Sequence, residues 1–293
     1  MRRIATLFAA TVSLFAATAR ADLADIAPAG FERGATFAVA GYTNANGTIR
    51  TETLSGFPVL VRIAENSPSG FSYSQLQMQD GADLCFVGMD GAGLPFEIDT
   101  WDPQGTSLVW VALPILTNGV PFGMCWGGTR SGKDVCAANP FAGYYGVWHM
   151  NEADAGDSSE NHLDGTADPS VTVVDARLGK GASFPSNAKI ETADAPNSAF
   201  ASSISFETWA RPSVVTERHA LFGKEALATF KIQSGTTFFT TPGKRTSRRS
   251  INRLARIHGI TSSSPTFQGN RPRSTSTECW SKPSATTKAA STI

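Results

Sequence analysis

Two carboxylates, two positions apart, are the residues of this chain whose type and spacing come nearest to catalytic chemistry. Glu97 and Asp99 lie in the segment Leu94-Pro-Phe-Glu-Ile-Asp-Thr-Trp-Asp-Pro and share one face if it is extended. Such a pair can act as nucleophile and acid in glycoside hydrolysis. Asp102 follows a tryptophan and precedes a proline, which predicts a turn rather than a third catalytic position. A solvated strand face is the simpler interpretation, and we predict a non-catalytic protein.

Trp101 falls on the same alternation as Glu97 and Asp99, so the three side chains are predicted to share a polar face. An exposed indole can stack on a sugar ring, whereas a buried one belongs to the core, the default for the other tryptophans. We therefore predict Glu97, Asp99 and Trp101 as ligand-binding residues, with carbohydrate or a cell-surface protein as the ligand.

A second acidic segment offers hard oxygen ligands. Asp154, Asp157, Asn161 and Asp164 fall in one predicted loop, and their carboxylate and amide oxygens suit calcium. The spacing is not that of an EF-hand, and a plain solvated loop is the alternative. Calcium is the one cofactor that the sequence suggests.

The cysteines leave their pairing open. Cys85 and Cys125 fall in predicted strands, Cys136 follows in a loop, and Cys279 lies near the end of the chain. Their spacings match no zinc pattern. One disulfide among the first three and buried free thiols are both compatible with the sequence.

The elements that position these residues are predicted to be strands. Residues 94–114 read as a β-hairpin with its turn at Asp102-Pro-Gln-Gly. Further strands are expected at 35–42, 57–63, 83–87 and 123–126, separated by Gly, Pro and Asn, with no convincing amphipathic helix. The pattern predicts an all-β chain of two β-sandwich domains.

The amino terminus has the features of a signal peptide over residues 1–21. Arg2 and Arg3 precede the apolar run 4–17, and Ala19-Arg20-Ala21 is a small-residue cleavage site. The chain is therefore expected to be exported to the periplasm, the cell surface or the medium. Disulfides are permitted there.

Residues 35–130 carry a resemblance in five segments that follow one another in the chain: Phe57-Pro-Val-Leu-Val-Arg, Asp83-Leu-Cys-Phe, Leu94-Pro-Phe-Glu-Ile-Asp-Thr-Trp, Val109-Trp-Val-Ala-Leu-Pro and Gly123-Met-Cys-Trp-Gly. They resemble the domain of unknown function 2341. The resemblance implies a bacterial, exported domain that often stands beside concanavalin A-like modules and biopolymer-transport proton channels. A membrane complex of that type is therefore a further expected partner, and a scaffold component of such a complex is an alternative function.

Residues 141–243 resemble the first half of a concanavalin A-like (laminin-G-like) jelly roll. The resemblance rests on Tyr144-Tyr-Gly-Val-Trp-His-Met-Asn-Glu, Asp157-Ser-Ser-Glu-Asn-His-Leu-Asp-Gly-Thr and Ile204-Ser-Phe-Glu-Thr-Trp-Ala-Arg-Pro. Family-16 glycoside hydrolases use a jelly roll too, with a Glu-x-Asp-x-Glu strand. A glycan-active enzyme is therefore the alternative to a binding protein.

The last 50 residues differ from the rest in charge. Residues 22–243 contain 12 basic and 24 acidic residues, whereas residues 244–293 contain ten and one. The tail lacks strand alternation and is predicted to be disordered. One hypothesis is a shifted reading frame, since skipping two bases in codons chosen for 257–268 yields Trp-His-His-Val, as a laminin-G-like module would show. The alternative is a natural basic tail that contacts an anionic surface, without a specific nucleic-acid site.

These expectations give four segments: a signal peptide (1–21), a β-sandwich domain (22–135), an incomplete jelly roll (136–243) and the basic tail (244–293).

Overall fold

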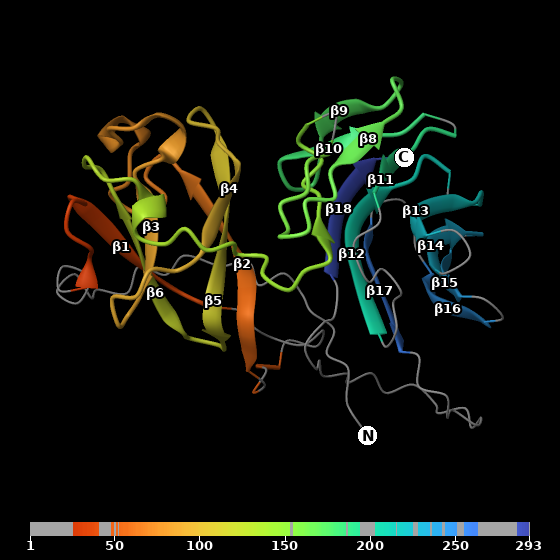
Figure 1. The fold of residues 1–293 in the computed structure, drawn as a ribbon, viewed down its shortest axis with the longest axis horizontal. Helices are drawn as coiled ribbons and strands as arrows, with labels where there is room; N and C mark the ends of the chain where they lie inside the picture. Colours follow the sequence, from red (N-terminus) through yellow and green to blue (C-terminus); the bar gives the residue numbers. More distant parts are fainter. Residues whose placement is uncertain are drawn as a thin grey trace. The chain divides into compact units, whose positions relative to one another are not determined.

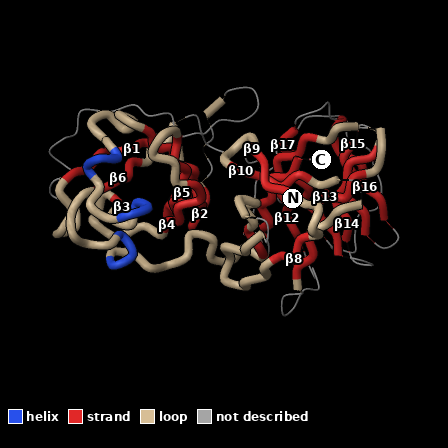
Figure 2. The backbone as a smooth tube through the Cα atoms, turned by 90° about the horizontal axis from the view of Figure 1, so that it is seen from above, coloured by secondary structure: helices blue, strands red, loops and turns tan. Residues whose placement is uncertain are grey.

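The computed structural model describes residues 26–40, 48–49, 51, 53–152, 155–185, 187–193, 203–214, 216–224, 228–234, 236–241, 244–250, 255–262 and 286–292 (Figure 1). The predicted signal peptide, Asp154 and Cys279 lie outside these residues. The chain divides into two compact units, with the division between Ala142 and Gly143. Both units are built from strands, and in the described residues short 3-10 turns occur in unit 1, which confirms the predicted all-β class (Figure 2).

Unit 1 contains two antiparallel three-stranded sheets, with strand orders β1-β6-β3 and β2-β5-β4. The predicted hairpin is present as β4, a turn and β5, and the other four predicted strands are present with shifted ends. The bounds are β1 (Arg33–Ala38), β2 (Leu54–Ala64), β3 (Leu84–Gly88), β4 (Phe96–Thr100), β5 (Thr106–Leu116) and β6 (Pro121–Trp126), with the 3-10 turns η1 (Tyr73–Gln75), η2 (Gln79–Gly81) and η3 (Gly132–Asp134).

The two sheets of unit 1 share one hydrophobic core. Alternate residues of β5 (Val109, Val111 and Leu113) enter it from one sheet, and Phe122 and Met124 enter it from the other. Alternation places every second side chain of a strand on the same face, so these apolar residues all point inward. The core holds β4 in place, and β4 carries the candidate residues Glu97 and Asp99.

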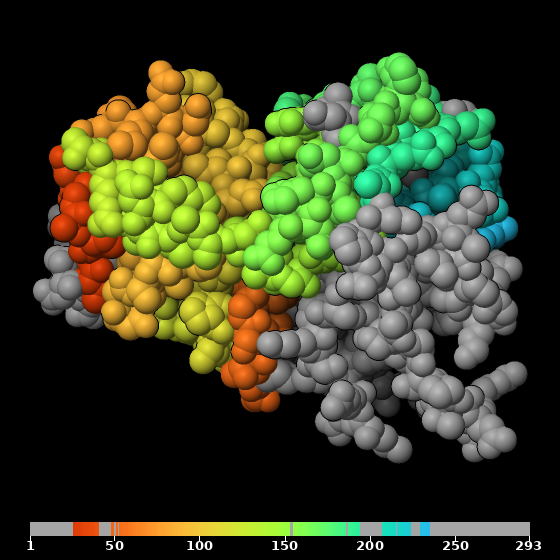
Figure 3. All heavy atoms as spheres, viewed as in Figure 1, coloured from red at the N-terminus to blue at the C-terminus, as the bar shows by residue number. Residues whose placement is uncertain are grey.

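The segment after β6 belongs to unit 1 rather than to a linker. Residues 129–140 contain Gly, Ser and Asn and have no periodicity, which predicts a linker between two domains. Gly132, however, lies so close to β3 that an added Cβ would be 1.6 Å from the carbonyl oxygen of Leu84. The Arg130 guanidinium donates to the carbonyl oxygens of Ala29 and Asp134. Lys133 is one of the exposed residues of this segment. The surface of unit 1 is coloured from red to yellow-green in Figure 3.

Unit 2 contains a sheet of order β17-β12-β18-β10-β9, with β7 beside β18, and the sheets β11-β8 and β13-β14-β15-β16. Trp148, Leu163 and Val171 form a core cluster with Met150, Ala155 and Ala182. The bounds are β7 (Gly146–Val147), β8 (Gly165–Ala167), β9 (Thr172–Asp175), β10 (Lys180–Ser183), β11 (Ile190–Thr192), β12 (Ser203–Arg211), β13 (His219–Lys224), β14 (Ala228–Gln233), β15 (Thr236–Thr241), β16 (Lys244–Ser250), β17 (Ala255–Ser262) and β18 (Thr286–Thr292).

The basic tail contains strands where none was expected. β16 pairs with β15, while β17 and β18 lie on either side of β12, antiparallel and parallel to it. Ladder hydrogen bonds join backbone groups, so a strand can form at a sheet edge without an apolar alternation in its sequence. The structure describes these three segments as strands, while the disorder of the tail as a whole and the shifted reading frame stay predictions.

Candidate functional site

The predicted polar face of β4 is present for two of its three residues. Glu97 stands opposite Trp110 of β5. The Asp99 Oδ2 atom accepts a hydrogen bond of 2.8 Å from the Trp110 indole nitrogen. The Asp99 Oδ1 atom accepts one of 3.2 Å from the Thr100 hydroxyl. Both carboxylates are half-buried, and Trp110 of the neighbouring strand orients the carboxylate of Asp99.

Trp101 does not share that face, and this part of the prediction is wrong. The pairing of β4 with β5 shifts between Ile98 and Thr100, which marks a bulge. A bulge adds one residue to one strand, so the side chains beyond it change sides. The Trp101 ring therefore packs against the core cluster, edge-on to Tyr73 at 5.2 Å between ring centroids.

Gly81 fixes the position of the Trp101 ring. A Cβ atom at Gly81 would be 2.6 Å from the indole, and Gly81 has a φ of +72°, which also favours glycine. Trp101 is thus a packing residue rather than a sugar-stacking platform.

Lys133 is a member of this region that sequence reasoning missed. Its Nζ atom donates a hydrogen bond of 2.6 Å to the Phe96 carbonyl oxygen and lies 4.7 Å from the centroid of the Phe96 ring. Partial burial lowers the pKa of Lys133, and the Glu97 carboxylate opposes part of that decrease. The residue lies in the segment taken for a linker, so nothing in the local pattern places it beside β4.

The third carboxylate of the hairpin has a turn role, as predicted. Asp102 Oδ1 accepts a hydrogen bond of 3.1 Å from the backbone N–H of Gln104. The backbone N–H of Asp102 itself donates to the Ser107 hydroxyl at 2.9 Å. Such side-chain bonds two residues along the chain are typical of aspartate at turns.

Asp157 organises the acidic loop of unit 2 through hydrogen bonds. Its Oδ1 atom accepts from the backbone N–H groups of Val147 at 2.7 Å and Ser159 at 2.9 Å. Its Oδ2 atom accepts from the Ser159 hydroxyl and the Leu163 N–H, both at 2.8 Å. Four donors converge on this carboxylate, which occupies the lone pairs that a calcium ion would need.

Two other predicted calcium ligands, Asp164 and Asn161, also form hydrogen bonds within this loop or to residues near it. Asp164 Oδ1 accepts a hydrogen bond of 2.8 Å from the Asp157 N–H. The Asn161 amide donates to the carbonyl oxygens of Tyr144 and Tyr145. Within the described residues, no group of three or more His, Cys, Asp or Glu side chains is placed to hold a metal ion. These hydrogen bonds favour the plain-loop interpretation over calcium.

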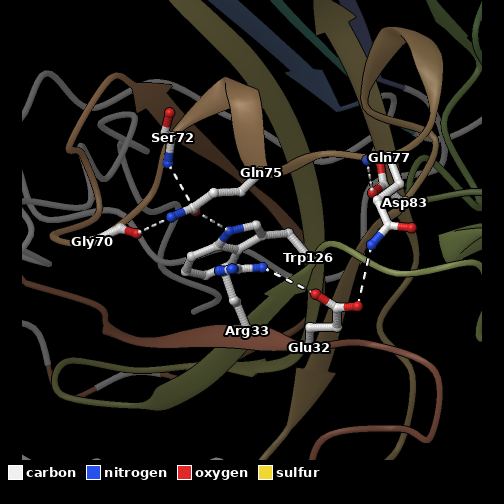
Figure 4. A network of polar contacts seen from close by, with 8 residues as sticks. All are labelled: Glu32, Arg33, Gly70, Ser72, Gln75, Gln77, Asp83 and Trp126. Carbon is white, nitrogen blue, oxygen red and sulfur yellow. Dashed lines mark hydrogen bonds and ion pairs between the residues drawn. The ribbon is translucent and has the colours of Figure 1, made fainter.

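A polar network in unit 1 surrounds the buried ends of Trp126 and Asp83 (Figure 4). The Trp126 indole donates to Gln75 Oε1 at 2.8 Å, and Gln75 closes a capping box with Ser72. Gln77 Nε2 donates to Glu32 at 3.2 Å, while its backbone N–H donates to Asp83 Oδ2 at 2.7 Å. Asp83 and Trp126 belong to motifs quoted above, but sequence reasoning placed no member of this network in a site.

Asp83 is fully buried, and its Oδ1 atom has no hydrogen-bond partner among the described residues. Buried polar atoms are nearly always hydrogen-bonded, which makes this oxygen an exception in unit 1.

Comparison with known proteins identifies no relative, because no family model, curated protein or solved structure matches the chain. In the described part of the chain, no helix combines the length and apolar character needed to cross a membrane. The two resemblances drawn from sequence motifs therefore stay predictions.

Proposed function

We propose that this chain is an exported, non-catalytic binding protein whose ligand is carbohydrate or a cell-surface protein. Export rests on the signal-peptide pattern of residues 1–21, and the binding role rests on the motif resemblances. The supporting observation from the fold is the β4 face, where Glu97 and Asp99 lie together and Trp110 orients Asp99. Carboxylates held in this way accept hydrogen bonds from sugar hydroxyl groups or from peptide N–H groups.

The surroundings of these carboxylates favour binding over hydrolysis. A glycosidase needs a second acid that can give up a proton to the leaving group. Here the Asp99 oxygens accept from Trp110 and Thr100, Glu97 lies near the Lys133 charge, and Asp102 is committed to a turn. The Trp110 ring is itself buried beside Phe141, with 6.1 Å between centroids, so it supports the face without stacking on a ligand.

A glycan-binding measurement tests the proposal. The full chain is applied to a panel of immobilised bacterial and plant cell-wall glycans, alongside Glu97→Gln and Asp99→Asn variants. We expect binding to at least one glycan and a loss of about tenfold or more in each variant, since a hydrogen bond to a charged group contributes roughly 1.5–3 kcal/mol. Reducing-sugar release is measured on the same glycans and is expected to be absent.

Glu191→Gln is the matched control, because Glu191 is an exposed carboxylate of unit 2 that pairs with Lys189 at 2.7 Å. It should bind as the wild type does. Glycan hydrolysis that stops in Glu97→Gln would establish the enzyme alternative. Unchanged glycan affinity in both β4 variants would show that the β4 face is not the binding site. Co-purification of a channel complex, without glycan binding, would favour the scaffold alternative.

A further inference from the structure

Two cysteines of unit 1 face each other across neighbouring strands. Cys85 of β3 is directly opposite Cys125 of β6 in an antiparallel ladder. Neither is exposed to solvent. They lie on the side of their sheet that faces away from the main core, where they cluster with Val87 and are covered by Ile26, Ala27, Phe31 and Val135. Cys136 is half-buried and follows η3.

Direct opposition places the two cysteines within reach of a covalent bond. Opposed residues of antiparallel strands have Cα atoms about 4.5–5.5 Å apart, inside the range of about 4.4–6.8 Å found in disulfides. Their Cβ atoms are about 4.5–5.5 Å apart, somewhat more than a disulfide prefers. Closing the bond therefore needs a small local approach of β3 and β6 and no change of register.

The two thiols already interact. A hydrogen bond between their side chains lowers the pKa of Cys125 and, together with burial, raises the pKa of Cys85. Cys125 is thus the thiol of the pair that loses its proton more readily. Disulfide exchange starts when one thiol of such a pair loses its proton, because the thiolate is the nucleophile.

We propose that Cys85 and Cys125 form a redox modification site, joined as a cross-strand disulfide by exchange with an oxidised dithiol of the thiol–disulfide oxidoreductase class. Cys125 first loses its proton, and its thiolate attacks one sulfur of the oxidant's disulfide, which gives a mixed disulfide and releases one thiolate of the oxidant. Cys85 then loses its proton and attacks the Cys125 sulfur, which releases the second thiolate. The cysteines lose two electrons and two protons, and the oxidant becomes a dithiol.

Burial determines when this exchange happens. Both sulfurs are covered in the folded unit, so an oxidant reaches them before β3 and β6 pair or while these strands are transiently apart. The inference concerns unit 1 alone and is independent of the ligand proposed above.

Mass spectrometry of the full chain tests the proposal. The protein is unfolded and refolded in oxidised and reduced glutathione, quenched with acid, alkylated with N-ethylmaleimide in guanidinium and digested. We expect one linked pair of peptides that contains Cys85 and Cys125, with Cys136 and Cys279 alkylated. The bond closes a loop of roughly 40 residues, so the unfolding temperature of unit 1 should fall by roughly 10 °C after reduction, less any strain in the bond.

Two variants keep the result unambiguous. Cys136→Ser is the matched control and should retain the link. Cys85→Ser should lose the link and leave Cys125 reactive. Alkylation of both Cys85 and Cys125 after refolding in excess oxidised glutathione, or a link from either residue to Cys136, would overturn the proposal, and these outcomes are read from the wild type even if a variant fails to fold.

Discussion

Asp157 in unit 2 and Asp83 in unit 1 are both buried aspartates, yet their surroundings differ. Asp157 is 6% exposed and accepts four hydrogen bonds, two on each oxygen. Asp83 is 0% exposed, accepts one bond from Gln77 on Oδ2 and has no partner for Oδ1 among the described residues. The Asp157 carboxylate joins the parts of its loop through hydrogen bonds, whereas the Asp83 carboxylate has one buried oxygen without a hydrogen bond from the described residues. Burial alone therefore does not reveal what an acidic residue contributes.

The largest expected effect is that of Asp157→Asn. In asparagine, an NH2 group replaces one of the two carboxylate oxygens. That NH2 group cannot accept the two hydrogen bonds that the oxygen accepts now, so at least two buried hydrogen bonds are lost. We expect the free energy of unfolding of unit 2 to fall by about 2–4 kcal/mol in urea denaturation. Glu160→Gln, an exposed change in the same loop, is the control and should leave the midpoint unchanged. Equal midpoints for both variants would show that the four bonds contribute little.

The same substitution at Asp83 should have a smaller effect. An asparagine oxygen can still accept from Gln77, the buried charge disappears, and the amide group replaces an oxygen that has no partner. We expect the free energy of unfolding of unit 1 to change by less than about 1 kcal/mol in either direction. Should Asp83→Asn be as destabilising as Asp157→Asn, the comparison breaks down, and a bound water or ion at Oδ1 would have to be sought.

Asp175 is an exposed aspartate, and its hydrogen bond is expected to have the smallest effect on stability of the three aspartates. Asp175 pairs with Lys180 across β9 and β10 at 2.6 Å, and this hydrogen bond lowers the pKa of Asp175. Because the folded-state pKa is depressed, any contribution to stability is present above the unfolded-state pKa and is lost as the pH falls through the folded-state pKa. NMR titration should give Asp175 a midpoint below its usual range, which Lys180→Met should move back up, with little change in unfolding at neutral pH. An unmoved midpoint in Lys180→Met would contradict this account.

The strands of unit 1 could be predicted because their sequence carries the information locally. Residues 108–113 form a continuous apolar run, which is typical of a strand buried on both faces, and the Asp102 turn is marked by Pro and Gly. The bulge after Ile98 leaves no such trace, because the alternation continues unbroken through Trp101. Only the pairing with β5 reveals that Trp101 changes sides.

The candidate sites were harder to predict because their partners are distant in sequence. Asp157 was predicted as a calcium ligand from its acidic neighbours, whereas one of its donors comes from Val147, ten positions away. Asp83 and Gln77 form part of a network completed by Glu32, whose position depends on β1. The residue types show which side chains can accept hydrogen bonds, but only the fold shows which donors lie close enough to form them.

The contact between Lys133 and the Phe96 carbonyl also affects how copies of the chain meet. β4 is the terminal strand of its sheet, and Phe96 points its carbonyl away from β5, since the neighbouring Pro95 accepts the bond from Ala112. A strand of another molecule that extended the sheet here would have to displace an ammonium group from that oxygen. One lysine thus discourages aggregation of the protein through this edge.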